Sequence, residues 1–533
     1  MSEASHDPIR LEVFKNLFAG IAEEMGVVLR KAAYSPNIKE RRDYSCAVFN
    51  ERGELISQAA HIPVHLGSMP LSVSAVLEKV ARDHAQLSPG DVYILNDPFR
   101  GGTHLPDITL VSPVFIDEVS STRPYAFVAN RAHHSDVGGM MPGSMPVARE
   151  IFQEGLIIPP IKLIDHGNMN EAVIDLVLAN VRTPDERRGD LFAQMAANRR
   201  GAIRLNEMLL RYGSATVSDY MGGLVAYTER MMRHSLQLLP DGVYSFVDYM
   251  DDDGLGHSHI PIQVAVTIEG DTAIVDFTGS ASQQEGSINA VLAITMSAVY
   301  YVFRCLVGLD IPNNHGCMAP ITIIAPERSI VNASMPAPVA GGNVETSQRI
   351  VDVLLGALAQ AAPEKVPAAS QGTMNNVTIG GWDERHHVAF AYYETIGGGM
   401  GARPDCHGVD AIHTHMTNTL NTPVEALEYA YPLRVERYEI RDGSGGEGHY
   451  HGGCGIRRDV RVLADAQVSL LTERRQSQPY GLAGGSPGLQ GANTLIRGDR
   501  EEPLPAKGTI YLQADDILSI CTPGGGGYGK PDG

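Results

Sequence analysis

Histidines and carboxylates gather in two short segments of this chain, at spacings that suit metal ligands. Three histidines and two aspartates make up the set: His104, Asp107, His133, His134 and Asp136. Imidazole nitrogens combined with carboxylate oxygens suit Zn, Mn or Fe(II). The sequence therefore predicts a metal-centred reaction site, and the alternative is a group of hydrogen-bonded histidines in turns.

A β-hairpin is the element that would bring the two segments together. Ile108–Ile116 and Pro124–Asn130 are both rich in β-branched and aromatic residues, which favours strands. The polar stretch Asp117–Arg123 between them is typical of a turn. The metal-binding residues then lie where one strand begins and the other ends.

The predicted register decides which histidine faces the cluster. Antiparallel pairing of Ile116 with Tyr125 places Asp107 opposite His134. Side chains alternate along a strand, so His133 and His134 point to opposite faces and at most one of them binds the metal directly. The other is expected to orient a ligand or to donate a proton.

Asp43 is a candidate fourth ligand. It follows Arg41 and Arg42 at the start of a predicted strand, in the same N-terminal part of the chain as the hairpin. A salt bridge with those arginines explains Asp43 equally well.

Polar side chains in the middle of the chain suggest a substrate cavity. The candidate substrate-binding residues are Asn343, Glu345, Gln371 and Asn375. Amides donate and accept hydrogen bonds without adding charge, which suits recognition of a carbonyl group. For any single amide, capping of a loop is the competing explanation.

Three glycine-rich segments raise the question of a nucleotide site, namely 397–401, 443–448 and 524–529. None contains the Gly-x-x-x-x-Gly-Lys-Ser/Thr pattern, and none joins a strand to a helix as a dinucleotide site requires. We interpret them as backbone turns that need a positive φ. No cofactor-binding residue is assigned, and any ATP is expected to be bound by another polypeptide.

Composition limits the classes of protein to consider. The formal charge is −20, from 42 basic and 62 acidic residues, which argues against nucleic acid or an anionic membrane as a partner. The six scattered cysteines form no Cys-x-x-Cys pair, as expected in a reducing compartment. No signal peptide is apparent, and no apolar run approaches the roughly 20 residues that cross a bilayer. We expect a cytoplasmic protein.

Hydrophobic periodicity predicts a mixed α+β fold with several lobes. The clearest predicted helix is Pro8–Ala33, and residues 170–238 are expected to be largely helical. Strands and glycine turns dominate the later part of the chain. The expected lobes are 1–238, containing the metal site, then 239–373, and a β-rich, glycine-rich lobe at 374–533; we expect them to be interleaved.

Several motifs together resemble the hydantoinase B/oxoprolinase family. They extend over nearly the whole chain: Arg42–Ala47, Pro63–Gly67, Asn96–Asp107, Asn130–Gly139, Glu154–Gly155, Gly342–Thr346, Ser370–Asn376, Asn421–Glu425 and Pro523–Gly529. One departure is Cys406-His407-Gly408, which stands where the family pattern has a more acidic turn.

The resemblance implies a function that the spacing alone does not. Family members are the B-type half of a two-component enzyme whose A-type half binds ATP and phosphorylates the substrate oxygen. Together the halves open cyclic amides such as hydantoins, 5-oxoproline or other lactams. The resemblance implies that His104, Asp107 and one of His133 and His134 bind the metal, with Asp43 as a fourth ligand. His134 or Asp136 is then expected to move the proton.

Two other functions compete with ring opening of a cyclic amide. The resemblance extends to subunits of ATP-dependent ketone carboxylases, of the acetone or acetophenone type, which would use the same metal site. A non-catalytic scaffold is the third possibility and predicts no bound metal. We rank the cyclic amide hydrolase first, acting in a hetero-oligomer with an A-type subunit.

Overall fold

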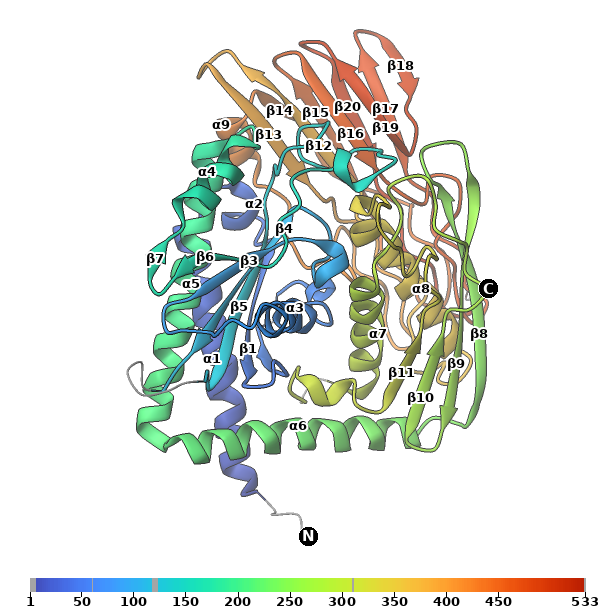
Figure 1. Ribbon diagram of the computed structural model, residues 1–533. Coiled ribbons are helices and arrows are strands. Elements are labelled where there is room, and N and C mark those ends of the chain that lie inside the picture. Colours follow the sequence, from blue (N-terminus) through green and yellow to red (C-terminus); the bar gives the residue numbers. More distant parts are fainter. Residues whose placement is uncertain (1–5, 60, 117–122, 309–310, 532–533) are drawn as a thin grey trace.

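The computed structural model describes residues 6–59, 61–116, 123–308 and 311–531. Helices and sheets are mixed along the chain, which confirms the predicted α+β class (Figure 1). Within these residues the strands form sheets of seven, four, four and five strands. The helices lie mainly in the N-terminal and central parts, and the last sheets come from the C-terminal part (Figure 1).

The seven-stranded sheet carries the predicted hairpin at its centre. Its strands, in spatial order, are β2 (Leu55–Gln58), β1 (Tyr44–Asn50), β5 (Ala126–His133), β4 (Asp107–Val114), β3 (Val92–Leu95), β6 (Ile161–Asp165) and β7 (Asn168–Met169). Strands β1, β3, β4 and β5 are buried along their whole length, as expected for a sheet that is covered on both faces. This burial fixes the ends of β4 and β5, where the candidate ligands lie.

Helices cover both faces of this sheet. One face packs against α1 (Pro8–Ala32) and α5 (Pro184–Tyr212), and the other packs against α3 (Met69–Arg82). The predicted helix at Pro8 is confirmed, and Asp7 caps it by accepting a hydrogen bond from the backbone of Ile9. The predicted helical region 170–238 is confirmed as α4 (Glu171–Ala179), α5 and α6 (Ser214–Gln237).

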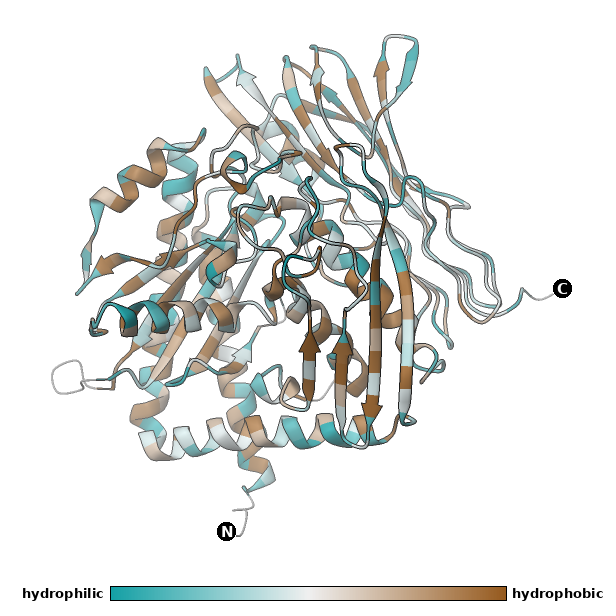
Figure 2. Cartoon of the chain, turned by 45° about the vertical axis from the view of Figure 1, so that its right-hand side comes forward, coloured by the Kyte–Doolittle hydropathy of each residue, from teal (hydrophilic) through white to brown (hydrophobic). Residues whose placement is uncertain are grey.

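A second sheet stands beside a pair of buried helices. Its order is β11 (Ile321–Ile324), β10 (Thr272–Asp276), β9 (Ser258–Glu269) and β8 (Gly242–Asp252). Apolar and polar bands alternate along its long strands in Figure 2, as in a sheet with one face toward the core. That face packs on α8 (Ser347–Leu358), which also contacts α7 (Leu292–Val307). Helix α6 runs along the base of the molecule toward this sheet (Figure 1).

The C-terminal part forms two further sheets and one short helix. The first sheet is β13 (Val388–Glu394), β12 (Asn376–Asp383), β16 (Ala466–Leu471) and β19 (Lys507–Leu512). The second is β14 (Leu433–Arg441), β15 (Gly455–Val462), β20 (Ile517–Cys521), β17 (Ala492–Arg497) and β18 (Arg500–Pro503). They enclose a common hydrophobic core, which α9 (Val424–Ala430) joins, while α2 (Pro36–Lys39) precedes β1.

The glycine-rich segments pack backbone against backbone, and the prediction of positive-φ turns was wrong for most of their glycines. Within 443–448 only Gly443 has a positive φ. Within 397–401 no glycine has a positive φ, and within 524–529 only Gly529 does. A Cβ on Gly399 would lie 2.0 Å from the carbonyl oxygen of Gly453, and one on Gly525 would lie 2.1 Å from that of Met400. Glycine is needed here because any side chain would separate the stacked segments.

No helix among the described residues is both long and apolar enough to cross a membrane. The division into lobes at residues 238 and 373 stays a prediction.

Candidate metal centre

The β4–β5 hairpin is present, but its predicted register was wrong by one residue. Asp107 pairs with His133, and Val114 pairs with Ala126. The prediction assumed that Ile116 pairs with Tyr125, whereas residues 117–122 between the strands lie outside the described residues. A shift of one residue changes which side chain shares a face with Asp107. His133 therefore faces the cluster, and His134 points away from it.

His104, Asp107 and His133 converge on one point. Nε2 of His104 lies 3.2 Å from Oδ1 of Asp107, and Nδ1 of His133 lies 3.4 Å from the same oxygen. One ligand atom from each residue falls within 4.8 Å of the others, and all three side chains are buried. This Oδ1 makes no hydrogen bond in the described structure. Two imidazole nitrogens around an oxygen without a hydrogen bond form a donor set that fits a transition-metal cation.

The electrostatics of the cluster favour an ionised Asp107 and a neutral His133. Burial raises the pKa of Asp107, but His104 and His65 more than offset this effect and hold that pKa well below its ordinary value. Burial lowers the pKa of His133, which favours its neutral imidazole. Metal binding requires an ionised carboxylate and a neutral imidazole.

The second oxygen of Asp107 is held by two residues that the sequence analysis did not assign to the site. The Thr103 hydroxyl donates to Oδ2 of Asp107 at 2.6 Å, and Nε2 of His65 lies 3.3 Å from the same atom. Nδ1 of His65 lies 2.9 Å from the Ser45 hydroxyl. His65 belongs to a motif that carries the family resemblance, but nothing in its spacing indicates proximity to Asp107.

Asp43 lines the same cavity as this cluster without belonging to the three-atom group. Its backbone carbonyl accepts a hydrogen bond from the backbone of His133 at 3.0 Å. Its carboxylate lies 4.0 Å from the guanidinium of Arg41, at the limit of an ion pair. Both roles considered for Asp43 thus retain a structural basis.

His134 and Asp136 contact other parts of the chain. Nε2 of His134 lies 2.9 Å from Oε1 of Gln194 on α5, and burial together with nearby Arg187 lowers the pKa of His134 to about 4. Asp136 accepts a hydrogen bond from the guanidinium of Arg182 at 2.9 Å and also accepts from three backbone amides. The structure does not bring these two side chains into the cluster.

The cavity at the cluster is small, and most of the side chains that line it are buried. Its volume is about 20 Å³, which admits about one water-sized group. Its wall combines polar and apolar side chains: Asp43, Ile62, Val64, His65, Asp107, His133, Asn343, Val344, Met374, Tyr393, Thr395, Met416, Thr417 and Thr419. Tyr393 stacks on the His133 imidazole, with ring centroids 4.2 Å apart.

Asn343 reaches the cluster from a π-helical turn, Gly342–Thr346, immediately before α8. Its Nδ2 lies 3.1 Å from Nε2 of His104, while its Oδ1 has no hydrogen-bond partner in the described structure. Such turns are frequent at functional sites. Glu345 on the same turn accepts hydrogen bonds from the backbone of Met374 and the side chain of Asn376. Burial raises the pKa of Glu345 to about 7.

Gln371 and Asn375 bind to each other and do not line the cavity. The Asn375 amide donates to Gln371 at 2.8 Å, and Arg475 donates to Asn375 at 2.8 Å. Of the four predicted substrate-binding residues, the structure therefore places only Asn343 in the cavity wall.

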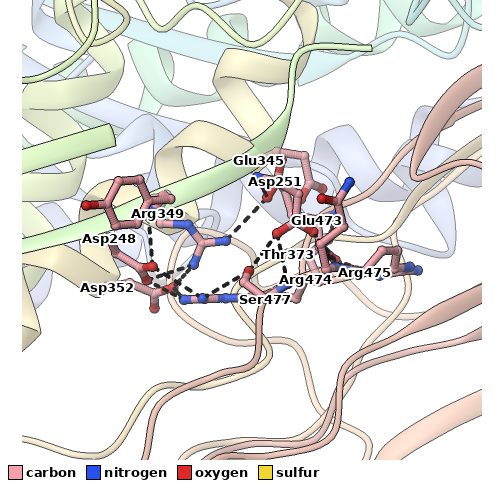
Figure 3. Close-up of polar contacts among 12 residues, drawn as sticks. Asp248, Asp251, Glu345, Arg349, Asp352, Thr373, Glu473, Arg474, Arg475 and Ser477 are labelled. Atoms are coloured by element: carbon pink, nitrogen blue, oxygen red, sulfur yellow. Dashed lines mark hydrogen bonds and ion pairs between the residues drawn. The ribbon is translucent and has the colours of Figure 1, made fainter. Parts of the chain in front are cut away.

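Arg475 belongs to a buried charge network behind α8 (Figure 3). Arg474 contacts Asp248 at 2.6 Å and Asp352 at 2.7 Å, so it joins β8 to α8. Arg349 on α8 contacts the same two aspartates, at 3.2 and 2.7 Å. The network fixes the helix whose N-terminal turn presents Asn343.

A family comparison covers nearly the whole chain. The sequence profile described as hydantoinase B/oxoprolinase matches residues 7–531. The chain belongs to the hydantoinase B/oxoprolinase family. This confirms the resemblance that the motifs indicated.

Individual proteins of known name extend the comparison. The chain is 40% identical to 5-oxoprolinase 1 of Arabidopsis thaliana over 99% of its own length, which is 42% of that protein. The chain thus spans about two fifths of this relative. It matches the crystal structure of the ATP-dependent caprolactamase of Pseudomonas jessenii with a TM-score of 0.90 and 30% identity, over 99% of this chain and 92% of that one.

An acetone carboxylase structure shares the fold. Its nucleotide-free form matches with a TM-score of 0.90 and 19% identity, over 98% of this chain and 76% of that one. At this identity the likeness concerns the fold alone.

Proposed function

We propose that this chain is the B-type component of an ATP-dependent cyclic amide hydrolase and that it carries the metal-assisted hydrolytic site. The observation that carries the proposal is the buried cluster of His104, Asp107 and His133 in a chain of the hydantoinase B/oxoprolinase family. The names of two relatives, a 5-oxoprolinase and a caprolactamase, support a cyclic amide as the substrate class.

In this proposal His104, Asp107 and His133 would hold a divalent metal, Zn, Mn or Fe(II), with Asp43 as a candidate fourth ligand. A metal in such a site lowers the pKa of water and polarises a carbonyl oxygen. Thr103 and His65 hold the other Asp107 oxygen, which keeps Oδ1 turned toward the imidazoles.

The surrounding side chains have distinct roles in this proposal. Asn343 binds the amide of the substrate, since its Oδ1 is buried without a partner beside His104. Glu345 holds the turn that carries Asn343 through its hydrogen bonds with Met374 and Asn376, and Gln371 and Asn375 contact each other and Arg475 outside the cavity. His134 and Asp136 position the strand end and the loop after it, because their polar atoms contact Gln194 and Arg182. Proton transfer by either residue would require it to turn toward the cluster.

ATP is used, in this proposal, by an A-type partner polypeptide, so the active enzyme is a hetero-oligomer. The Arabidopsis 5-oxoprolinase supports this view because more than half of its length lies outside the part that this chain matches. The caprolactamase supports it because that enzyme is ATP-dependent by name, although the matched chain has a similar length to this one. A cytoplasmic location stays an expectation.

Elemental analysis of the full-length chain tests the metal centre directly. We expect near-stoichiometric Zn, Mn or Fe in the wild type and its loss in the His104→Ala/Asp107→Ala double variant. His257→Ala is a matched control, because His257 is an exposed histidine paired with Asp253 outside the cluster. Retention of metal in the double variant would contradict the assignment.

Product analysis with the A-type partner separates the hydrolase from the carboxylase alternative, which the acetone carboxylase fold keeps open. The hydrolase predicts ATP-dependent ring opening of 5-oxoproline, hydantoin or ε-caprolactam. ATP-dependent consumption of acetone and bicarbonate, with no turnover of any cyclic amide, would establish the alternative instead.

A further inference from the structure

Three threonines share the cavity with the candidate metal ligands and have no role in the function proposed so far. Thr395, Thr417 and Thr419 line the same cavity as Asp107 and His133. Behind the threonines lies the guanidinium of Arg41, whose side chain is fully buried. The three threonines lie between β13 and α9. Sequence periodicity did not connect this part of the chain to the metal-binding hairpin.

Hydrogen bonds join Arg41 and the three threonine hydroxyls into one continuous series. Arg41 Nη2 donates to Oγ1 of Thr395 at 2.5 Å and approaches Oγ1 of Thr419 at 3.4 Å. The hydroxyls of Thr395 and Thr419 lie 3.0 Å apart, and those of Thr417 and Thr419 lie 3.3 Å apart. Among the described residues, the only acidic contact of this guanidinium is Asp43, at 4.0 Å.

A count of hydroxyl protons shows that the hydrogen-bonded series of Arg41 and the three threonines contains one unused donor. Arg41 only donates, so Thr395 accepts from it and keeps its own proton for another partner. The three hydroxyls share two contacts, which use two of their three protons. Within the described part of the chain these hydroxyls make no other side-chain hydrogen bond, so one O–H is left over. Each hydroxyl donates to the next one farther from the guanidinium, because hydrogen bonds aligned in one direction strengthen one another. The unused O–H is therefore that of Thr417.

We propose that the Arg41–Thr395–Thr419–Thr417 chain is an oxyanion-binding site and that Thr417 donates to a negatively charged oxygen of the substrate beside the metal centre. A hydroxyl polarised by a buried guanidinium is a stronger donor than an isolated one. It remains neutral itself, so it places no cation in the cavity next to the metal-binding residues. Arg41, Thr395 and Thr419 act as positioning residues.

The size and polarity of the cavity suit one oxygen atom. About 20 Å³ admits a single oxygen of a larger ligand, and the wall around it combines polar and apolar side chains. The anionic oxygen belongs either to a phosphoryl group, as in a phosphorylated amide, or to a carboxyl group, as in 5-oxoproline. This inference rests on the proposed function, and the two sources are separated by experiment.

Anion binding to the full-length chain loaded with Co²⁺ tests the site. The visible spectrum of Co²⁺ reports anions that bind beside it, and the probes are formate and inorganic phosphate. We expect Thr417→Val to keep its Co²⁺ content and to bind the preferred anion about tenfold more weakly, or worse, through loss of a hydrogen bond to a charged group. A phosphate effect alone identifies a phosphoryl site, and a formate effect alone identifies a carboxylate site.

Thr422→Val is the matched control. Thr422 is a buried threonine on the same segment, does not line the cavity, and has no hydrogen-bond partner for its hydroxyl in the described structure. We expect wild-type anion affinity in this variant. Thr395→Val should weaken anion binding as well, since it separates Arg41 from the other hydroxyls.

Wild-type anion affinity in a fully loaded Thr417→Val variant would overturn the proposal, as would a wild type that binds neither anion. Failure of the wild type to take up Co²⁺ would instead count against the metal centre. In that case the shift in Tm that formate or phosphate causes in the metal-free chain decides the inference. A larger shift in the wild type than in Thr417→Val supports the oxyanion site, and equal shifts refute it.

Discussion

Asp107 is the residue on which the candidate metal centre depends, because its two oxygens have different surroundings. Oδ2 accepts a hydrogen bond from Thr103 and lies beside His65, whereas Oδ1 lies between His104 and His133 without a hydrogen bond. A carboxylate fixed through one oxygen presents the other in a constant direction. Partners that orient a ligand in this way contribute to metal affinity almost as the ligands do.

Removal of the Thr103 hydroxyl should therefore weaken metal binding without unfolding the chain. Thr103→Val preserves the shape of the side chain and removes the 2.6 Å hydrogen bond to Asp107. We expect metal affinity to fall by about 10-fold or more, measured by competition with a chelator. Thr228→Val, which removes a buried hydroxyl with no described partner from α6, should leave the affinity unchanged. Equal affinities in all three proteins would contradict the role of Thr103.

At the scale of elements, the sequence predicted the helices and strands that local residue patterns determine. The period of the first helix and the β-rich runs of the hairpin are local, and both elements are present. The register of the hairpin is not determined by either strand alone, and the predicted pairing of Asp107 with His134 was wrong by one residue. His65 and Thr417 reach the cavity through packing between distant segments. No spacing rule could place them there.

The π-helical turn before α8 requires glycine at its first position. A Cβ on Gly342 would lie 1.8 Å from the carbonyl oxygen of Asn289, so Gly342→Ala must displace the turn that carries Asn343. We expect a loss of about 1–3 kcal/mol in the free energy of unfolding. Denaturant titration measures this loss. Gly222→Ala in α6, where nothing lies within 4 Å of the new Cβ, should stabilise the chain by roughly 0.5–1 kcal/mol. Destabilisation of the same size in both variants would show that the contact with Asn289 is unimportant.

At the scale of the whole molecule, the buried charge network joins parts of the chain that are far apart in sequence. Asp248 lies on β8, Asp352 lies on α8, and Arg474 follows β16 of the C-terminal part (Figure 3). Removal of two charges from water is costly, and their attraction offsets that cost only while every partner is present. The network therefore makes the position of α8, and with it Asn343, depend on the C-terminal sheets.

Loss of one partner should destabilise the whole molecule far more than loss of a surface ion pair. Arg474→Met leaves Asp248 with Arg349 alone and removes the 2.7 Å contact to Asp352, and we expect a decrease of about 3–5 kcal/mol in the free energy of unfolding. Arg149→Met breaks an ion pair with Glu285 in which both side chains are 62% exposed, and it should cost about 0–1 kcal/mol. Chemical denaturation of the two variants compares these values directly.

Because the network also supports the turn that carries Asn343, the metal affinity of folded Arg474→Met should fall while that of Arg149→Met stays at the wild-type value. A destabilised Arg474→Met that binds metal normally would show that the network holds the fold together without acting on the candidate site.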